Sequence, residues 1–416
     1  MQHKLTNCIL CNSDKLDKLI ELNSTPLGDS FKKNKKDSLS LKKYDLTLML
    51  CDKCKQIQLS TIVDPEDVYD EDYLYTTDIS LGLSEHFNLS AKNIISRFKL
   101  ISSDLVIEIG SNKGIMLKAF QKNNINVLGI EPAKYAVTQA IKMGVDTIND
   151  FFTTKVSDEI IANNKNVKVI LANNVIANIP NLSEVFKSIE KLLIINDGVF
   201  IFETSYSKDV VDYQLVDTIY HEHISYLSLN AIENSLNQFG LRLFDAQYID
   251  TKGGSIRGYV SVFNSSLHKK TNQLEKLLQE EKETKFYTKN DIFYQNLDSL
   301  KDSVKEYISF LTEIKHKVIC YGASVGCTTM LYNCGLEDCD ILLDDNKSKI
   351  DKYSPGLGIK VYNSDYIYDN NVKYIIVLAW RYIEQISKKH KSFLDNGGKF
   401  LVVELPTCKL VEYKNG

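Results

Sequence analysis

The sequence predicts an α/β protein in which a small four-cysteine zinc module precedes two Rossmann-like units. Three observations support this fold class. Two C-x2-C pairs stand near the amino terminus, strands and helices alternate around a glycine-rich turn from Leu105 onward, and a second strand with a glycine turn starts at Lys317. Such alternation is typical of parallel sheets covered by helices. We expect domains over 1–75, 76–260 and 261–416, the last including a helical connector.

Composition agrees with several domains and narrows the partners. A chain of 416 residues with 44% hydrophobic content exceeds what one core usually holds. Its 50 basic and 54 acidic residues give a net charge of -4, so no footprint for nucleic acid is evident and a small-molecule substrate is favoured. The chain has no apolar run of membrane-spanning length, and Met1–Leu10 lacks a signal-peptide core. We therefore expect a cytoplasmic protein without a membrane partner.

The first element in the chain is the pair of C-x2-C knuckles formed by Cys8, Cys11, Cys51 and Cys54. Two such knuckles can complete a closed tetrahedral zinc site, which anchors structure and leaves no position for water. Two unrelated surface pairs or a redox motif are the alternatives. The sequence predicts structural Zn²⁺.

An acidic, tyrosine-rich stretch follows at 64–75 and leads into an amphipathic run over 81–98 that we expect to be a helix. Tyr73 and Tyr75 could donate hydroxyl hydrogen bonds to a polar ligand, although packing is an alternative role for each of them.

The strand at 105–109 runs directly into a glycine turn that ends at Gly114 and precedes a helix. Such a turn lets a nucleoside approach the backbone. Glu131, about twenty residues further on, ends the next strand and can accept hydrogen bonds from ribose hydroxyls. Nicotinamide, flavin and S-adenosylmethionine enzymes all use such turns, but Glu108 is suited to the amino group of a methionine tail. S-adenosylmethionine is therefore the favoured cofactor, and the domain over 76–260 a methyltransferase domain.

Asp150 and the aromatic faces of Phe151 and Phe152 could contact adenine, with packing of the phenylalanines an equal alternative. The complete set of predicted cofactor-binding residues is Glu108, Gly110, Ser111, Asn112, Gly114, Glu131, Pro132, Asp150, Phe151, Phe152, Asn173 and Asn174.

The segment 217–226 carries Tyr220, His221, Glu222, His223 and Tyr226 within a short stretch. An imidazole beside a carboxylate can serve as a general base near neutral pH, and a tyrosine hydroxyl can stabilise an enolate. A metal site and a solvated polar turn are the alternatives. We interpret the segment as catalytic.

Strands at 340–343, 374–378 and 399–403 follow the one at Lys317 and complete a second Rossmann-like unit. It could bind a nucleotide or only support the first unit. The charged helical segment 269–315 is the predicted connector.

Taken together, these motifs resemble those of the sugar 3-C-methyltransferases, which act on nucleotide-linked 4-keto deoxysugars. The resemblance spans nearly the whole chain and rests on the two knuckles, Pro26-Leu-Gly-Asp-Ser-Phe31, Asp72-Tyr-Leu-Tyr75, the glycine turn 106–114, Gly129-Ile-Glu-Pro-Ala133, Tyr220-His-Glu-His223, Gly253-Gly-Ser-Ile-Arg257 and Tyr321-Gly-Ala323.

The resemblance implies that His223 removes the proton next to the ketone and that Glu222 orients it. Tyr220 and one of Tyr73 or Tyr75 would hold the enolate. It also implies a substrate-binding set made of Gly253, Gly254, Ser255, Arg257 and Tyr321. Backbone N–H groups and the guanidinium of the first four suit a diphosphate, although these glycines could instead mark a bulge.

Three positions differ from the pattern that this family leads one to expect. Asn178 and Lys252 each stand where a histidine is usual, and Gly326 stands where a lysine is common. Asn178 cannot act as a base but joins the predicted catalytic shell. The alternatives to C-methylation are O- or N-methylation of a sugar nucleotide, a nicotinamide-dependent oxidoreductase and a noncatalytic binding protein.

Overall fold

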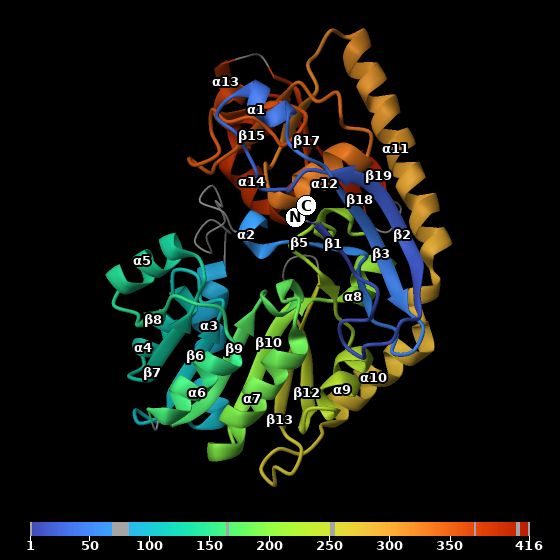
Figure 1. The fold of residues 1–416 in the computed structure, drawn as a ribbon. Helices are drawn as coiled ribbons and strands as arrows, with labels where there is room; N and C mark the ends of the chain where they lie inside the picture. Colours follow the sequence, from blue (N-terminus) through green and yellow to red (C-terminus); the bar gives the residue numbers. More distant parts are fainter. Residues whose placement is uncertain are drawn as a thin grey trace.

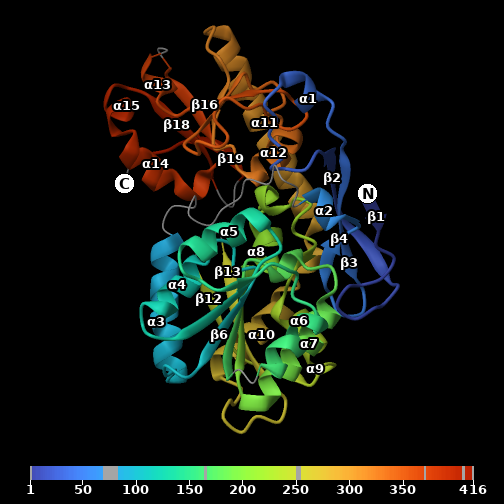
Figure 2. The ribbon, with the colours of Figure 1, turned by 60° about the vertical axis from the view of Figure 1, so that its left-hand side comes forward.

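The computed structural model describes residues 2–68, 83–163, 166–249, 254–369, 372–404 and 408–414. Figures 1 and 2 show two α/β lobes, one above the other, with an antiparallel sheet from the amino-terminal part of the chain along one side of both. Among the described helices, none combines the length and apolar character needed to span a bilayer.

The amino-terminal sheet has the strand order β11-β4-β3-β2 and is antiparallel throughout. Three of its strands are sequential, but β11 comes from the middle of the chain and directly follows the predicted catalytic residues. A two-stranded ribbon of β1 and β5 lies beside it. The strands are β1 (Gln2–Lys4), β2 (Leu16–Thr25), β3 (Tyr44–Cys51), β4 (Ile57–Leu59), β5 (Thr61–Val63) and β11 (Ser225–Tyr226).

The lower lobe contains a seven-stranded sheet of order β12-β13-β10-β9-β6-β7-β8, parallel except at β12 and β13. Its first strand alternates between faces, with Val106 packing on one side and Ile107 on the other. The strands are β6 (Leu105–Ile109), β7 (Asn126–Ile130), β8 (Thr147–Ile148), β9 (Val167–Asn173), β10 (Val199–Ser205), β12 (Leu241–Ile249) and β13 (Ser255–Val262).

Helices cover both faces of this sheet, as the alternating pattern predicts. One face packs against α3 (Leu83–Phe98), α4 (Ile115–Gln121) and α5 (Lys134–Lys142). The other packs against α6 (Thr154–Ala162), α7 (Leu182–Asn196), α9 (Leu229–Asn237) and α10 (Asn272–Thr284).

The upper lobe is a six-stranded sheet of order β16-β15-β14-β17-β18-β19, in which β19 alone is antiparallel to its neighbour. The order reverses between β14 and β17, which is where Rossmann-like sheets open a crevice for ligands. The strands are β14 (Ile319–Tyr321), β15 (Ile341–Asp344), β16 (Lys360–Asn363), β17 (Tyr374–Val377), β18 (Lys399–Glu404) and β19 (Lys409–Glu412).

The predicted connector is helical and includes α11 (Asn290–Glu313), which runs along one side of the molecule into the upper lobe (Figure 1). The remaining helices are α1 (Lys35–Leu39), α2 (Pro65–Val68), α8 (Ser207–Asp212), α12 (Val325–Asn333), α13 (Tyr366–Asp369), α14 (Ile383–Lys389) and α15 (Lys391–Asp395).

One apolar cluster ties the lobes together. It contains Leu46 and Leu48 of the amino-terminal sheet, Ile219 and Tyr226 from the predicted catalytic segment, and residues of α12 in the upper lobe, among them Met330. The predicted catalytic segment is therefore packed between the amino-terminal sheet and the upper lobe.

Candidate active site and zinc centre

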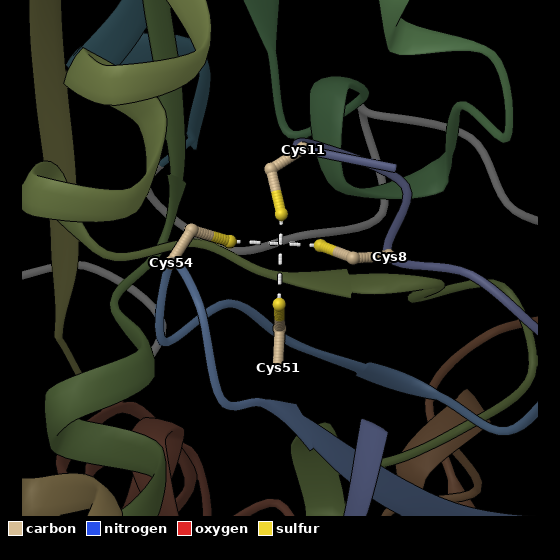
Figure 3. A group of neighbouring side chains, drawn as sticks. All are labelled: Cys8, Cys11, Cys51 and Cys54. Atoms are coloured by element: carbon tan, nitrogen blue, oxygen red, sulfur yellow. Dashed lines mark hydrogen bonds between the residues drawn. The ribbon is translucent and has the colours of Figure 1, made fainter. Parts of the chain in front are cut away.

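The four knuckle cysteines converge on one point. Their sulfur atoms all lie within 4.8 Å of one another, and the Sγ atoms of Cys8 and Cys54, and of Cys11 and Cys51, are 3.6 Å apart. Figure 3 shows the four sulfur atoms facing a common centre. Tetrahedral zinc with Zn–S bonds of about 2.3 Å places sulfur atoms about 3.8 Å apart, so the cluster fits the ion. The donors are four thiolates, which makes the site structural and closed.

The zinc knuckles are linked to the middle of the chain through Gln58. This buried side chain accepts a hydrogen bond from the Ile9 N–H at 2.9 Å and donates to the Asn7 carbonyl at 3.2 Å, while its own residue pairs with Ser225 in the sheet. In the same way, the Leu59 N–H donates to the Ile224 carbonyl at 2.9 Å. The zinc module therefore supports the segment that follows His223.

A cavity of about 450 Å³ opens at the carboxyl ends of β6, β7 and β9. Most of the predicted cofactor-binding residues line it, together with four of the predicted catalytic residues. These are Glu108, Gly110, Ser111, Asn112, Glu131, Pro132, Phe151, Phe152, Asn173 and Asn174, and Tyr220, Glu222, His223 and Asn178. Motifs separated by more than a hundred residues in the printed sequence thus share one cavity.

Glu108 is a strongly perturbed carboxyl group in the cavity wall. One oxygen accepts a hydrogen bond from the Asn173 side chain at 3.0 Å, and the other, Oε2, is buried without a hydrogen-bond partner among the described residues. Burial raises the pKa of Glu108 to about 8. A buried carboxylate with an unmet acceptor suits a cation, such as the amino group of a methionine tail.

Glu131 directly follows the next strand, β7, and backbone N–H groups around it fix its carboxylate. Its two oxygens accept hydrogen bonds from the Asn112 and Ala133 N–H groups, each at 2.9 Å. Burial raises its pKa. Each carboxylate oxygen has a second lone pair, so Glu131 can also accept the two hydroxyls of a ribose.

The glycine turn that precedes α4 has the backbone conformation its sequence predicts. Gly110 and Gly114 have φ angles of +67° and +77°, a region that favours glycine. Gly114 and Asp150 are not part of the cavity wall, and Asp150 is exposed and accepts a hydrogen bond from the N–H of Phe151 at 2.8 Å. Adenine contact by Asp150 stays a prediction.

The catalytic turn, which we define as residues 218–223, has a hydrogen-bond order that fixes the state of His223. Its Nδ1 lies 3.0 Å from the Thr218 carbonyl oxygen, which can only accept, so Nδ1 carries the hydrogen. In the neutral imidazole Nε2 is then an acceptor, and the Tyr220 hydroxyl donates to it at 2.8 Å. A carbonyl group therefore holds Nδ1, and the orienting role that the sequence hypothesis gave to Glu222 stays a prediction.

His221, the other histidine of the turn, faces away from the cavity. It is buried beside Tyr44, with Nε2 3.4 Å from that residue's carbonyl oxygen, and burial lowers its pKa to about 4. His221 is therefore a neutral packing residue.

Comparisons with known proteins agree with this arrangement. A zinc binding domain model matches residues 8–69, a methyltransferase domain model matches 85–246, and a C-methyltransferase C-terminal domain model matches 250–406. The C-methyltransferase NovU of Streptomyces niveus is 28% identical over 402 residues, which are 96% of this chain and 95% of that protein. The chain is an S-adenosylmethionine-dependent C-methyltransferase.

Solved structures give more distant similarities. A Clostridium acetobutylicum S-adenosylmethionine-dependent methyltransferase is 14% identical, with a TM-score of 0.33, and covers 43% of this chain and 92% of its own. The plantazolicin methyltransferase BpumL in complex with SAH is also 14% identical, with a TM-score of 0.34 over 43% of this chain and 84% of its own.

Arg257, predicted to bind a diphosphate, has a charged partner within the lower lobe. Arg257 is on β13, and its guanidinium donates to the Glu203 carboxylate at 2.6 and 3.1 Å, while His86 Nε2 lies 3.0 Å from the same carboxylate. Burial raises the pKa of Glu203, but the His86 hydrogen bond and the Arg257 charge outweigh it and hold the pKa below its ordinary value. The positive charge of Arg257 is thus paired with the carboxylate of Glu203 inside the lower lobe.

The other members of the predicted substrate set are also outside the described cavity wall. Ser255 is buried on β13, Gly254 precedes it, and the Tyr321 hydroxyl donates to Asp345 at 2.8 Å in the upper lobe. Gly253 and the tyrosines Tyr73 and Tyr75 lie outside the described residues.

Sequence reasoning missed several residues of the site. Phe87 of α3, Glu184 of α7 and Val325 of α12 line the cavity, and Thr218 orients His223. Val325 comes from the upper lobe, next to the glycine turn that the sequence had marked, so that turn was the available signal.

Proposed function

We propose that this methyltransferase removes the proton next to the ketone of a nucleotide-linked 4-keto deoxysugar and methylates that carbon. One observation carries the proposal: His223 Nε2, in its acceptor state, lines the same cavity as Glu108 and Glu131. A base and a methyl donor that share a cavity can act on one carbon atom in succession.

His223 acts as the general base. When substrate enters, its α C–H takes the place of the Tyr220 hydroxyl at Nε2, and the proton moves to Nε2 while Nδ1–H stays on the Thr218 carbonyl. A C–H next to a ketone is acidic enough for an imidazole only if the enolate oxygen is stabilised. The released Tyr220 hydroxyl is the group that supplies this hydrogen bond.

S-adenosylmethionine supplies an electrophilic methyl group on a sulfonium sulfur. Glu108 would accept hydrogen bonds from its amino group and Glu131 from its ribose hydroxyls, which would hold the methyl donor in the cavity that His223 also lines. The enolate carbon forms the new C–C bond as the C–S bond breaks, and S-adenosylhomocysteine leaves with the electron pair on sulfur.

The choice of a sugar nucleotide rests on the combination of motifs around this cavity. The Tyr220 to His223 turn, the two knuckles and the carboxyl-terminal unit stand together in one chain, as in the family that the sequence resembles. The wall also contains Asn178, which can hydrogen-bond a carbonyl or hydroxyl group but cannot remove a proton.

The test separates deprotonation from methyl transfer. The zinc-loaded enzyme is incubated in D₂O with S-adenosylhomocysteine and a panel of thymidine, uridine, cytidine and guanosine diphosphate 4-keto deoxyhexoses. We expect deuterium at one carbon next to the ketone, and methylation at that carbon when S-adenosylmethionine replaces S-adenosylhomocysteine. Glu131→Ala should keep the exchange without S-adenosylmethionine and lose most of the methylation.

Two outcomes would replace the proposal. Methylation of a hydroxyl or amino group without exchange would assign the enzyme to O- or N-methylation of sugar nucleotides. Neither exchange nor methylation of any sugar in the panel, by protein that binds S-adenosylhomocysteine, would exclude these keto sugars as acceptors.

A further inference from the structure

The carbonyl group that orients His223 belongs to a short 3-10 turn, Val216–Thr218, that is held from the upper lobe. Arg381 binds the Asp217 carboxylate through both terminal nitrogens, and the Trp380 indole N–H donates to the same carboxylate at 3.2 Å. On the other side, the Thr329 hydroxyl of α12 donates to the Ile219 carbonyl at 2.6 Å. Upper-lobe contacts thus flank Thr218 on both sides in the sequence.

These contacts come from segments that follow β14 and β17, the two strands between which the order of the upper sheet reverses. Trp380 and Arg381 follow β17, and α12 follows β14, so both face the point where the strand order reverses. Rossmann-like sheets receive a ligand anion at such a point. In this protein the carboxylate of Asp217 lies near this point and pairs with the guanidinium of Arg381. Both side chains are largely buried, with 17% of Arg381 and 10% of Asp217 exposed.

Gly326 allows this approach. A Cβ atom at this position would overlap the backbone carbonyl oxygen of Asp217, so α12 and the turn can pack this closely only without a side chain there. Its neighbour Val325 lines the active-site cavity. The glycine that stands where the family commonly has lysine is therefore part of the same contact.

We propose that Asp217 and Arg381 are positioning residues for the catalytic base. Their ion pair holds the turn so that the Thr218 carbonyl keeps the hydrogen of His223 on Nδ1, and Nε2 stays a hydrogen-bond acceptor. This inference rests on the proposed role of His223. It assigns to the upper lobe a direct part in methyl transfer, beyond contact with substrate.

The physical basis is the specificity of both interactions. A bidentate guanidinium–carboxylate pair fixes orientation as well as distance, and in this partly buried place it is less screened than a surface pair. In a neutral imidazole, an acceptor such as a backbone carbonyl beside one ring nitrogen holds the hydrogen on that nitrogen and leaves the other nitrogen as an acceptor. Rotation of the 216–218 turn would withdraw the carbonyl oxygen and let the hydrogen redistribute between Nδ1 and Nε2.

The experiment compares Asp217→Asn, Arg381→Gln and Arg381→Lys with the wild-type full chain. The ¹⁵N chemical shifts of the histidine side chains are recorded without substrate, and the His223 signals are assigned by their loss in His223→Gln. We expect Nδ1–H in the wild type, and a shift toward Nε2–H in Asp217→Asn and Arg381→Gln. In the same two variants kcat should fall about tenfold or more while the KM for S-adenosylmethionine changes less than about twofold. Arg381→Lys, which keeps the positive charge, should lie between Arg381→Gln and the wild type in both the His223 tautomer and kcat.

Arg97→Gln is the matched control, because Arg97 of α3 also forms a partly buried pair, with Asp245 of β12 at 2.7 Å, and neither residue lines the active-site cavity. It should leave the His223 tautomer and kcat unchanged. If Asp217→Asn fails to fold, Thr329→Val removes the other upper-lobe contact without changing side-chain shape.

The proposal is overturned if Nδ1–H persists in Asp217→Asn and Arg381→Gln, whether or not kcat falls. It is also overturned if the tautomer changes and kcat does not. Because the tautomer is measured without an acceptor, this result stands apart from the proposed sugar substrate, whose failure would appear as an inactive wild type.

Discussion

Each of the two Rossmann-like sheets has a first strand that leads into a glycine turn, but carboxyl groups near the two turns have opposite pKa shifts. In the lower sheet, burial raises the pKa of Glu108 to about 8 and leaves one of its oxygens without a hydrogen-bond partner among the described residues, beside an open cavity. In the upper sheet, Asp345 receives hydrogen bonds from Tyr321, Ser364 and Lys389. Burial raises the pKa of Asp345, but these bonds outweigh it and hold the pKa below its ordinary value.

The glycine turns differ in the same way. Gly110 borders the lower cavity, whereas the upper turn is packed against the chain itself, with Gly28 against Val325 and Gly326 against Asp217. One feature is shared: Asp344 accepts hydrogen bonds from the N–H groups of Ala323 and Asn346 at 2.6 and 2.7 Å, as Glu131 does from two backbone N–H groups in the lower sheet. A strand and glycine turn therefore predict a fold, and the groups left unsatisfied around the turn indicate which of two similar units binds a ligand.

The largest effect should come from removing the base in the lower cavity. In His223→Gln we expect methyl transfer to fall by about 10²- to 10⁴-fold, because general base catalysis contributes roughly that much. S-adenosylhomocysteine affinity, measured by calorimetry, should stay within about twofold, since the proposed cofactor contacts, Glu108 and Glu131, are on β6 and directly after β7. His316→Gln, at a half-buried histidine of the upper lobe outside the cavity wall, should behave as wild type. Retention of more than a tenth of the rate by His223→Gln would remove His223 from the mechanism.

A second effect should come from the zinc module, which belongs to neither sheet but pairs with β11. Chelation of zinc, or Cys51→Ser, should melt the knuckles and loosen the Gln58 link to Ser225. We expect activity to fall about tenfold or more, with a smaller change in S-adenosylhomocysteine affinity. Zinc content by absorption spectroscopy and activity are followed together.

Cys408→Ala is the control for that experiment, because Cys408 is a buried thiol in the upper lobe and is not part of the zinc cluster. It should retain zinc and activity. Full activity in metal-free protein would show that the module does not support the catalytic turn.

Local sequence patterns predicted much of this molecule. The strands at β6, β7 and β9, the helix over α3 and the closeness of the four cysteines all follow from periodicity or spacing, which act within a few residues or through one ion. The cavity could also be anticipated, because the carboxyl ends of parallel strands meet at one edge.

The partners of the charged groups could not be predicted in this way. The motif around Arg257 predicted a diphosphate contact, and it gave no sign of the ion pair that Arg257 forms with Glu203 on the neighbouring strand. Nor did any motif indicate that Arg381 pairs with Asp217, 164 positions away in the chain. Such pairs depend on how separate lobes pack, and neither hydrophobic periodicity nor motif spacing carries that information.

The smallest effect tests the raised pKa of Glu108 directly. Since this carboxyl group is largely protonated in the free enzyme below pH 8 and must ionise to hold an ammonium group, binding of S-adenosylhomocysteine should weaken as the pH falls. With a pKa of about 8, ionisation falls from about one half at pH 8 to about one tenth at pH 7, so the affinity should drop about fivefold. Calorimetry in buffers of different ionisation enthalpy should detect proton release near pH 7.

Glu108→Gln should bind S-adenosylhomocysteine more weakly and lose the pH dependence, whereas Glu184→Gln, at another part of the cavity wall, should keep it. An affinity that is constant from pH 6.5 to pH 8 in the wild type would mean that Glu108 is ionised before the cofactor arrives, and the contrast with Asp345 would then lie only in hydrogen bonding.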